Sequence, residues 1–359
     1  MKFVDEFRDQ EIAKGLIEKI KKSSTRPIQL MEVCGTHTVS IFRYGIRGLL
    51  PEQIRLVSGP GCPVCVTPNS DIDFAIALSR QKDVILTTFG DMMKVPGSTS
   101  NLQKEKAGGR DIRIIYSSLD ALKIAKENPQ KRVVFFAIGF ETTSPTIAVA
   151  ILHTREERIQ NLFFLNSQKR IPPAILSLLQ SRELKIDGFI LPGHVSAIIG
   201  TTPYQFISKD FSLPAVITGF EPLDILQSIW MLIKQIEESR PAIEIQYRRI
   251  VPEEGNPTAL SKINEVFERD GALWRGLGLI PDSGYQFKKS YKELNARNFE
   301  VEVEPPQEHP ECLCGEVLKG VKIPLACRLF KVECHPENPI GPCMVSVEGT
   351  CNTYFKFSD

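Results

Sequence analysis

The stretch VVFFAIGFETT at residues 133–143 decides the fold, because six apolar residues in succession end at a glycine and polar residues follow. A short apolar run that is bounded by a turn is typical of a strand buried on both faces. Similar runs occur at 83–88 and 188–191, and stretches of helical character lie between strands at 118–126 and 174–180. Strands that alternate with helices indicate parallel βαβ units. The sequence therefore predicts an α/β protein.

The same pattern continues toward the N-terminus. Apolar residues recur at helical spacing within 11–22, which predicts an amphipathic helix. Apolar runs at 27–33 and 54–58 predict two more strands, and each leads into a cysteine motif. Loops at the carboxyl ends of strands are where α/β folds bind ligands. A five-residue match between AIGFE (137–141) and ITGFE (217–221) is compatible with two similar α/β lobes.

Composition and charge exclude several classes of protein. The 359 residues include 44 Lys and Arg and 43 Asp and Glu, a net charge of +1, so no field of a single sign is available to hold nucleic acid or an anionic membrane surface. The longest apolar run, at 133–138, is far shorter than the roughly 18 residues of a membrane span. The first residues lack an apolar segment with a cleavage site, so we expect no signal peptide and a cytoplasmic protein.

Nine cysteines fall into two groups at opposite ends of the chain. In a reducing compartment, clustered cysteines indicate metal binding or redox chemistry rather than a disulfide scaffold. Three lie within the first 65 residues and six lie within the last 48. The two groups are Cys34, Cys62 and Cys65, and Cys312, Cys314, Cys327, Cys334, Cys343 and Cys351.

The C-terminal group carries the strongest signal. Four thiolates placed by loops suit either a tetrahedral zinc site or a cubane iron-sulfur cluster. No Cys-x-x-Cys pair, the usual arrangement of zinc ligands, occurs after residue 65, and the wide intervals favour a [4Fe-4S] cluster held by several loops. A zinc site and buried structural cysteines are the alternatives. The intervals run through Cys314, Cys327, Cys334 and Cys351, with Cys312 and Cys343 beside them as extras.

The segment GPGCPVC at 59–65 supplies a redox-type Cys-x-x-Cys. Its turn brings the sulfurs of Cys62 and Cys65 within disulfide reach and lowers one thiol pKa. The alternative is half of a zinc knuckle completed by Cys34 and His37. Those two residues lie three apart, on one face of a helix that begins at Gly35, and a helix N-terminus favours the Cys34 thiolate as a soft ligand for Fe(II). His37 would orient or protonate what Cys34 holds.

Weaker candidates follow other predicted strands. Asp91, Glu141, Thr142 and His194 lie in polar loops after such strands and are expected to line a cleft. Ordinary helix capping is the alternative for Asp91 and Thr142. The chain contains neither a P-loop nor a Gly-x-Gly-x-x-Gly motif, so binding of a nucleotide by either loop has no support.

Five motifs in order over the chain resemble those of the HypD family of hydrogenase maturation factors: CGTHT (34–38), GPGCPVC (59–65), GFETT (139–143), PGH (192–194) and MVSVEGTC (344–351). The resemblance implies a scaffold that builds the Fe(CN)2CO unit of [NiFe]-hydrogenases with the small chaperone HypC and with HypE, which delivers cyanide as a C-terminal thiocyanate. It further implies that Cys34 binds Fe(II) carrying CN and CO, and that Cys62 and Cys65 form a redox dithiol. The implied [4Fe-4S] ligands are Cys314, Cys327, Cys334 and Cys351, which leaves Cys312 and Cys343 without a role.

The resemblance also implies two α/β lobes that face a cleft and a small loop-rich iron-sulfur domain assembled with help from the N-terminal segment. We accordingly expect residues 1–50 to pack with the C-terminal domain at 241–359, and the lobes to occupy 51–135 and 136–240. Two functions compete with this one: an independent iron-sulfur thiol-disulfide oxidoreductase and a zinc-stabilised binding scaffold. The sequence indicates neither the source of CO nor whether ATP is hydrolysed.

Overall fold

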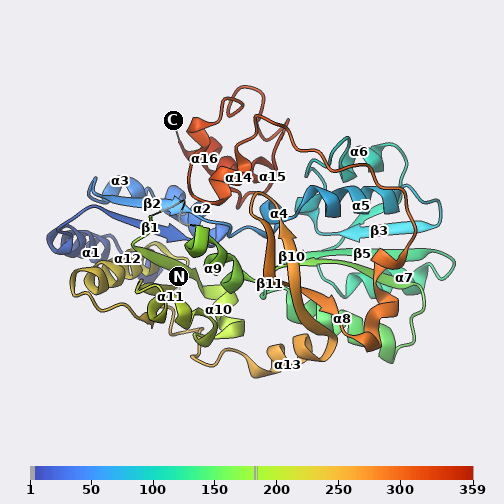
Figure 1. Cartoon of the computed structure of the whole chain (residues 1–359), viewed down its shortest axis with the longest axis horizontal. Coiled ribbons are helices and arrows are strands. Elements are labelled where there is room, and N and C mark those ends of the chain that lie inside the picture. The colour runs from blue at the N-terminus through green and yellow to red at the C-terminus, as the bar shows by residue number, and fades with distance from the viewer. Residues whose placement is uncertain (1–4, 182, 184, 359) are drawn as a thin grey trace.

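The computed structural model describes residues 5–181, 183 and 185–358, and it confirms the α/β class. The strands are β1 (Ile28–Glu32), β2 (Ile54–Ser58), β3 (Val84–Thr88), β4 (Ile112–Ile114), β5 (Arg132–Gly139), β6 (Leu162–Gln168), β7 (Gly188–Pro192), β8 (Ala215–Thr218), β9 (Ile243–Ile245), β10 (Phe267–Trp274) and β11 (Gly278–Phe287). Sheet A has the order β2-β1-β7-β8-β9, and sheet B has the order β4-β3-β5-β6. Both sheets are parallel, and Figure 1 shows them side by side with the strands β10 and β11 between them.

Helices connect these strands. The α-helices are α1 (Gln10–Ser23), α2 (Gly35–Arg43), α3 (Ile46–Leu49), α4 (Pro63–Val66), α5 (Asn69–Ser79), α6 (Leu102–Ala107), α7 (Asp120–Glu127), α8 (Ser144–Glu156), α9 (Ile171–Ser181), α10 (Gly193–Ile199), α11 (Gln205–Lys209), α12 (Pro222–Glu237), α13 (Pro257–Val266), α14 (Cys314–Leu318), α15 (Pro342–Val345) and α16 (Thr350–Phe357). The 3-10 helices are η1 (Asp5–Phe7), η2 (Gly90–Met92), η3 (Thr202–Tyr204), η4 (Lys289–Leu294), η5 (Ala296–Asn298) and η6 (Pro324–Ala326).

The helix predicted at 11–22 is α1, and it packs with α12 on one face of sheet A (Figure 1). The carboxylate of Asp9 accepts hydrogen bonds from two free amides of the first turn, which fixes the start of the helix. Ile17 and Ile20 are buried against the sheet, whereas the lysines and glutamates between them face solvent. Its amphipathic pattern therefore marks the outer layer of sheet A.

The quoted stretch at 133–143 begins with β5, an inner strand of sheet B. Val133 and Phe135 point into a core shared with α7 and α8, whereas Val134 and Phe136 point into a second core shared with α5. Successive side chains of a strand face opposite sides of the sheet, so a strand covered on both faces has no polar position. This explains the unbroken apolar run in the sequence.

Neither sheet is built from a single one of the ranges expected for the lobes, 51–135 and 136–240. β2 pairs with β1, which lies before residue 51, and β6 pairs with β5, which itself crosses residue 135. The chain leaves sheet A after β2, builds all of sheet B, and returns to sheet A at β7. Periodicity in a sequence identifies strands but not their partners, and a parallel connection can lead to either sheet.

Residues 241–300 adjoin the lobes rather than the cysteine-rich unit. β9 extends sheet A, α13 packs against α8, and β10 and β11 form an antiparallel hairpin between the lobes. At the turn of this hairpin, Gly276 has a φ of +77°, and a Cβ placed on it would lie 2.5 Å from the Cα of Gly315 in α14. Only glycine combines that conformation with so close an approach. The hairpin thus contacts the cysteine-rich unit through two glycines.

The cysteine-rich unit consists of residues 312–358 and lies above the junction of the lobes in Figure 1. Its last helix, α16, packs against α2 near the N-terminus of the chain. The guanidinium of Arg47 donates to the hydroxyl of Tyr354 at 2.6 Å and lies 4.4 Å from the ring centre of Phe42. The first 50 residues and the last 50 are therefore packed together.

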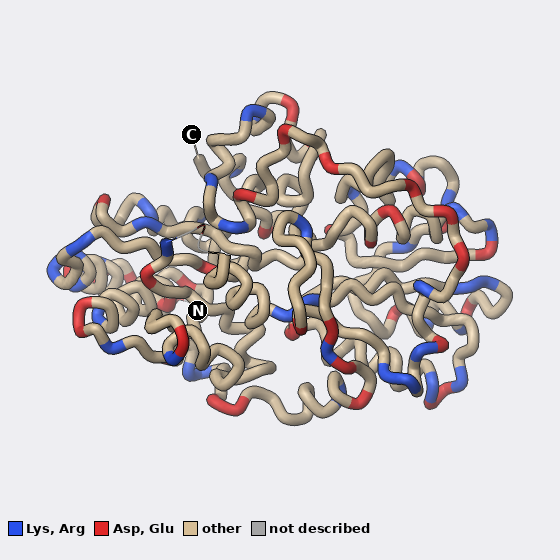
Figure 2. The backbone as a smooth tube through the Cα atoms, viewed as in Figure 1, with Lys and Arg blue, Asp and Glu red and all other residues tan. Residues whose placement is uncertain are grey.

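No helix among the described residues is long and apolar enough to cross a membrane. Figure 2 shows basic and acidic residues interspersed over both lobes, in keeping with the net charge of +1.

Candidate functional site

Cys34 stands at the carboxyl end of β1, directly before α2. Because β1 and β2 are adjacent parallel strands, their carboxyl ends bring the Cys34 and Cys62 motifs together. The amide of Gly35 donates to the carbonyl of Gly61 at 3.0 Å. A Cβ on Gly61 would lie 2.2 Å from the backbone nitrogen of Cys34, so a larger residue would separate the two motifs.

The ionisation of Cys34 differs from the sequence-based expectation. Burial first, and then the carboxylate of Glu348, raise the pKa of Cys34 to about 12. The amides of Thr36 and His37 at the start of α2 lower the pKa, as the helix N-terminus should, but they do not offset burial. The free thiol is therefore protonated at neutral pH, and a metal ion must displace the proton to bind it.

Glu348 connects the cysteine-rich unit to the Cys34 motif. The hydroxyl of Thr36 donates to its carboxylate at 2.6 Å. A Cβ placed on Gly35 would lie 2.6 Å from the Cβ of Glu348. Its charge acts to raise the pKa of both Cys34 and Cys65. Sequence reasoning did not select Glu348, although it lies within the motif at 344–351.

His37 is fully buried and fixed in one orientation. Its Nε2 lies 3.0 Å from the carbonyl oxygen of Gly219 and 3.2 Å from that of Thr218, so Nε2 carries the proton and donates. Burial lowers the pKa of His37 to about 4, and the ring is neutral at physiological pH. The single proton of the neutral ring is held by the two backbone carbonyls, which disfavours the expected role as a proton donor, whereas the buried Nδ1 is an acceptor without a partner among the described residues.

Phe220 joins two of the predicted site residues. The ring of His37 stacks on Phe220 at 4.7 Å between centres, and the centre of the His194 ring, an exposed residue, lies 4.1 Å from that of Phe220. Burial also lowers the pKa of His194. Phe220 belongs to the ITGFE repeat, and this repeat was the only feature of the sequence that pointed to Phe220.

The carboxyl group of Glu32 lies beneath the Cys34 motif. The hydroxyl of Thr38 donates to it at 2.7 Å, and burial raises the pKa of Glu32 to about 8. A carboxyl group with this pKa is largely protonated at neutral pH. Glu32 stands in an apolar run of the sequence that predicts a strand. The prediction of the site therefore missed it.

Cys62 directly precedes α4 and Cys65 lies within it. Both residues are buried. Burial opposes ionisation of both thiols. Hydrogen bonds from Cys343 and Cys62, aided by the charge of Arg275, nevertheless lower the pKa of Cys65 to about 6. The same interaction between the two thiols helps to raise the pKa of Cys62 well above its usual value. The thiolate form is thus favoured at Cys65 and the protonated thiol at Cys62. The Cys-x-x-Cys motif predicts such a difference.

Arg275 reaches this site from the turn of the β10–β11 hairpin. Its backbone amide donates to the carbonyl of Val66 at 2.9 Å, one residue after Cys65. The guanidinium is buried, and its Nε lies 3.2 Å from the carboxylate of Glu308. The sequence could not associate Arg275 with Cys65, because more than 200 positions separate them.

Cys343 joins the dithiol to the C-terminal cysteines. Its sulfur accepts a hydrogen bond from the thiol of Cys314 at 3.1 Å, and the thiols of Cys65 and Cys351 also act on its pKa. These interactions and burial raise the pKa of Cys343 well above its usual value. Cys343 was left without a role in the sequence, yet it occupies the centre of the site.

All six C-terminal cysteines line one enclosed cavity. Within the described part of the chain, no three His, Cys, Asp or Glu side chains converge as a single metal ion requires. A [4Fe-4S] cluster needs a wider arrangement, because each thiolate binds a different iron atom. The donor set, entirely thiols within an apolar wall, fits such a cluster. The lining residues are Cys312, Leu313, Cys314, Val317, Cys327, Leu329, Phe330, Cys334, Gly341, Cys343, Met344 and Cys351.

The remaining candidates lie apart from the cysteines. Asp91 and Thr142 are exposed in the loops after β3 and β5. Glu141 is buried and accepts a hydrogen bond from the amide of Ile171 at 3.1 Å, at the start of α9. Burial raises the pKa of Glu141 to about 7. Its position indicates that Glu141 caps α9 and compensates the charge of Arg170. The charge of Arg170 in turn acts to lower the pKa of Glu141.

Comparison with known proteins identifies the family of the chain. The HypD family model, described as "Hydrogenase formation hypA family", matches residues 11–358. Hydrogenase maturation factor HypD2 of Bradyrhizobium diazoefficiens is 46% identical over 373 aligned residues, which cover 100% of this chain and 98% of that protein. Hydrogenase maturation factors HypD of Rhodobacter capsulatus and Escherichia coli K12 are 44% and 43% identical, and each alignment covers 99% of this chain and 98% of the relative. The chain therefore belongs to the HypD family of hydrogenase maturation factors.

Proposed function

We propose that the protein is the scaffold and redox component on which the Fe(CN)2CO unit of [NiFe]-hydrogenases is assembled. One observation carries the proposal: the Cys34 motif, the Cys62/Cys65 pair and the C-terminal cysteines meet in one continuous site. An iron-binding thiol, a two-electron donor and a one-electron source are the three parts that this chemistry needs. They come from opposite ends of the chain.

Cys34 is the proposed ligand of the iron that is the cargo of the site. A soft thiolate suits low-spin iron with cyanide and CO, because it donates electron density that those ligands accept. The Cys34 proton leaves when iron binds. The neutral ring of His37 is fixed three residues away, so it serves as a positioning group rather than as an acid.

Cys62 and Cys65 are the proposed source of two electrons. Release of cyanide from a protein thiocyanate breaks its S–C bond and leaves a thiolate and cyanide, which consumes two electrons. Formation of a disulfide between Cys62 and Cys65 supplies two electrons and releases the protons that the thiols carry. The lowered pKa of Cys65 makes it the thiolate that begins this exchange.

We further propose that the cluster ligands are four cysteines of which Cys312 is one and Cys314 is not. Cys314 is buried with its sulfur 3.1 Å from that of Cys343, whereas Cys312 is partly exposed, and the charges of Cys314, Cys351 and Cys334 all act on its pKa. This revises the ligand set that the resemblance implied. When bound, a [4Fe-4S] cluster supplies single electrons, and two such electrons would restore the dithiol. The proposed ligands are Cys312, Cys327, Cys334 and Cys351.

The proposed partners are HypC, which would share the iron, and HypE, which would deliver the thiocyanate. The compartment is the cytoplasm, where free thiols stay reduced. The curated relatives support a role in hydrogenase maturation by their names.

The test is infrared spectroscopy of the anaerobically purified complex of this chain with HypC and HypE. Cyanide stretching bands of protein-bound iron should appear with the natural sequence and with a Ser40→Ala control in α2. They should disappear with Cys34→Ala, while the visible absorption of the cluster persists. Bands that survive Cys34→Ala would contradict the role of Cys34. A colourless protein with one zinc ion per chain would support the zinc scaffold, and disulfide reduction without either partner would support the oxidoreductase.

A further inference from the structure

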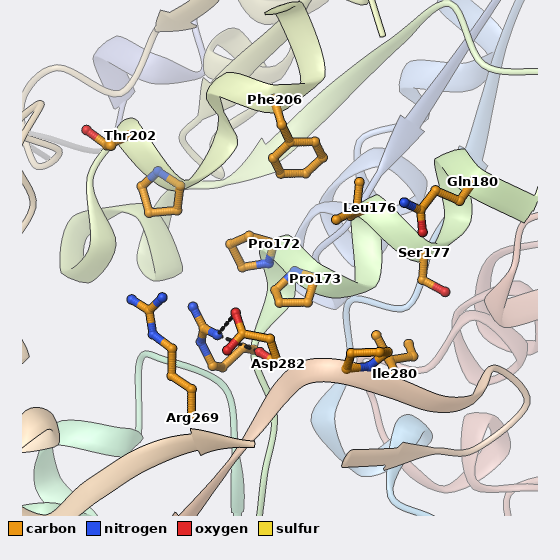
Figure 3. A pocket seen from close by; sticks show the side chains of 13 residues that line it. Pro172, Pro173, Leu176, Ser177, Gln180, Thr202, Phe206, Arg269, Ile280 and Asp282 are labelled. Atoms are coloured by element: carbon orange, nitrogen blue, oxygen red, sulfur yellow. Dashed lines mark hydrogen bonds and ion pairs between the residues drawn. The ribbon is translucent and has the colours of Figure 1, made fainter. Parts of the chain in front are cut away.

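A cavity of about 610 Å³ opens between the two lobes, away from the cysteine site (Figure 3). This volume lies in the range of sites for small organic molecules, roughly 300–1,000 Å³. Three parts of the fold form its walls: the end of β6 with α9, the segment η3–α11 of the lobe of sheet A, and the strands β10 and β11. The lining residues are Arg170, Pro172, Pro173, Leu176, Ser177, Gln180, Thr202, Pro203, Phe206, Arg269, Ile280, Pro281 and Asp282.

One end of the cavity is cationic. Arg170 is buried, and its guanidinium lies 2.7 Å from the carboxylate of Asp282, so these two charges compensate each other. Arg269 extends from β10 into the same end of the cavity (Figure 3). Its guanidinium has no hydrogen bond or ion pair to any residue that the structure describes. The charge of Arg269 acts on the buried Glu141, whose pKa burial raises to about 7, but the guanidinium keeps all of its hydrogen-bond donors free for an anion.

The middle and the other end are apolar. The rings of Pro172, Pro173 and Phe206 surround the centre of the cavity, and Leu176 and Ile280 lie at the end away from Arg269 (Figure 3). Pro172 and Pro173 stand in the first turn of α9, where proline costs no hydrogen bond. Rigid rings form an apolar wall that changes little when a ligand binds.

We infer that this cavity binds a small amphipathic organic anion, whose apolar body lies on Pro172, Pro173 and Phe206 and whose anionic group pairs with Arg269. The ligand class is defined by one negative charge at the edge of an apolar body. This site uses none of the cysteines, so it stands independently of the proposed role in iron assembly.

The test uses two fluorescent probes that share their ring systems. 8-Anilinonaphthalene-1-sulfonate carries a sulfonate, and N-phenyl-1-naphthylamine is neutral. Each is titrated into the full-length protein. We expect the anionic probe to bind with one high-affinity site per chain, and Arg269→Gln to weaken it about tenfold, which is the effect of one lost charge-assisted hydrogen bond. Binding of the neutral probe should stay unchanged in Arg269→Gln.

Two controls make the result specific. Arg110→Gln removes a different exposed arginine, in the loop before β4, and should leave both probes unaffected. Phe206→Ala removes part of the apolar wall and should weaken both probes. The inference is overturned if Arg269→Gln binds the anionic probe like the natural sequence, if Arg110→Gln weakens it equally, or if a correctly folded Phe206→Ala binds both probes unchanged. Circular dichroism verifies the folding of each variant.

Discussion

The sulfur of Cys314 lies 3.1 Å from the sulfur of Cys343, inside the unit that also holds four further cysteines. A thiol in such contact with another thiol is engaged in that pair. This contact distinguishes Cys314 from Cys312, which lies two positions earlier in the sequence. Both residues line the same cavity. The contact gives the first testable difference between them.

Cys312→Ser should abolish cluster binding, whereas Cys314→Ser should retain it. A [4Fe-4S] cluster corresponds to about four iron and four sulfide ions per chain, and loss of one ligand from four destabilises the whole cluster. The measurement is iron and acid-labile sulfide per chain after anaerobic purification, together with the visible absorption. A full cluster in Cys312→Ser and none in Cys314→Ser would restore the ligand set that the resemblance implied.

Arg275→Gln should make Cys65 less reactive. Removal of a positive charge disfavours the thiolate, so the pKa of Cys65 rises from about 6 and its alkylation at pH 6.5 slows severalfold. Iodoacetamide labelling followed by peptide mass spectrometry measures Cys65 separately from the other eight cysteines. Arg275→Lys keeps the charge and should react faster than Arg275→Gln. Equal rates in the two variants would show that the charge of Arg275 does not act on Cys65.

Glu348→Gln should lower the pKa of Cys34. Glutamine removes the negative charge that raises this pKa but keeps an oxygen to accept the hydrogen bond from Thr36. The rate of Cys34 alkylation should therefore begin to rise at a lower pH than in the natural sequence. Glu311→Gln, which removes an exposed carboxylate directly before the cysteine-rich unit, is the control. An unchanged pH profile in Glu348→Gln would contradict the proposed coupling.

His37 should make the protein less stable in acid. Its pKa is about 4 in the folded state and about 6.5 when unfolded, so protons bind preferentially to the unfolded chain. The contribution of the neutral ring is complete above pH 6.5 and is lost as the pH falls from 6.5 to 4, by up to about 3 kcal/mol in the free energy of unfolding.

Urea denaturation at several pH values measures this effect. His37→Gln should be less stable than the natural sequence at pH 7 and should have a flatter dependence on pH between 6.5 and 4. His335→Gln, at a surface histidine, should keep the slope of the natural sequence. Parallel curves for His37→Gln and the natural sequence would show that His37 does not bind protons on unfolding.

The secondary structure of the lobes was readable from the sequence, because each buried parallel strand is an apolar run between turns. The strand predicted at 54–58 agrees residue for residue with β2, and the helix predicted at 11–22 is α1. The pairing of β6 with β5 across the expected boundary at residue 135 was not readable. The β10–β11 hairpin was also missed, because charged residues and glycine at 268–271 and Pro281 with Asp282 interrupt its apolar residues.

The site shows the same division between local and distant information. Cysteine motifs are local, and the sequence identified Cys34, Cys62 and Cys65. The charges that act on these thiols come from Glu348 and Arg275, more than 200 residues away in sequence. Spacing alone could not distinguish Cys312 from Cys314, because the loop between two ligands has no fixed length. The contact of Cys314 with Cys343 is the observation on which we propose to separate them.

The contact between Gly35 and Glu348 has a consequence for the order of synthesis. Sheets A and B, which place Cys34, Cys62 and Cys65, are complete at β9, so they are synthesised before Cys343 and Glu348. The thiol pair of a nascent chain therefore has neither its hydrogen-bonding partner Cys343 nor the carboxylate that restrains Cys34. The complete set of contacts around these thiols therefore forms only after Cys343 and Glu348 have been synthesised and have packed against the earlier motifs.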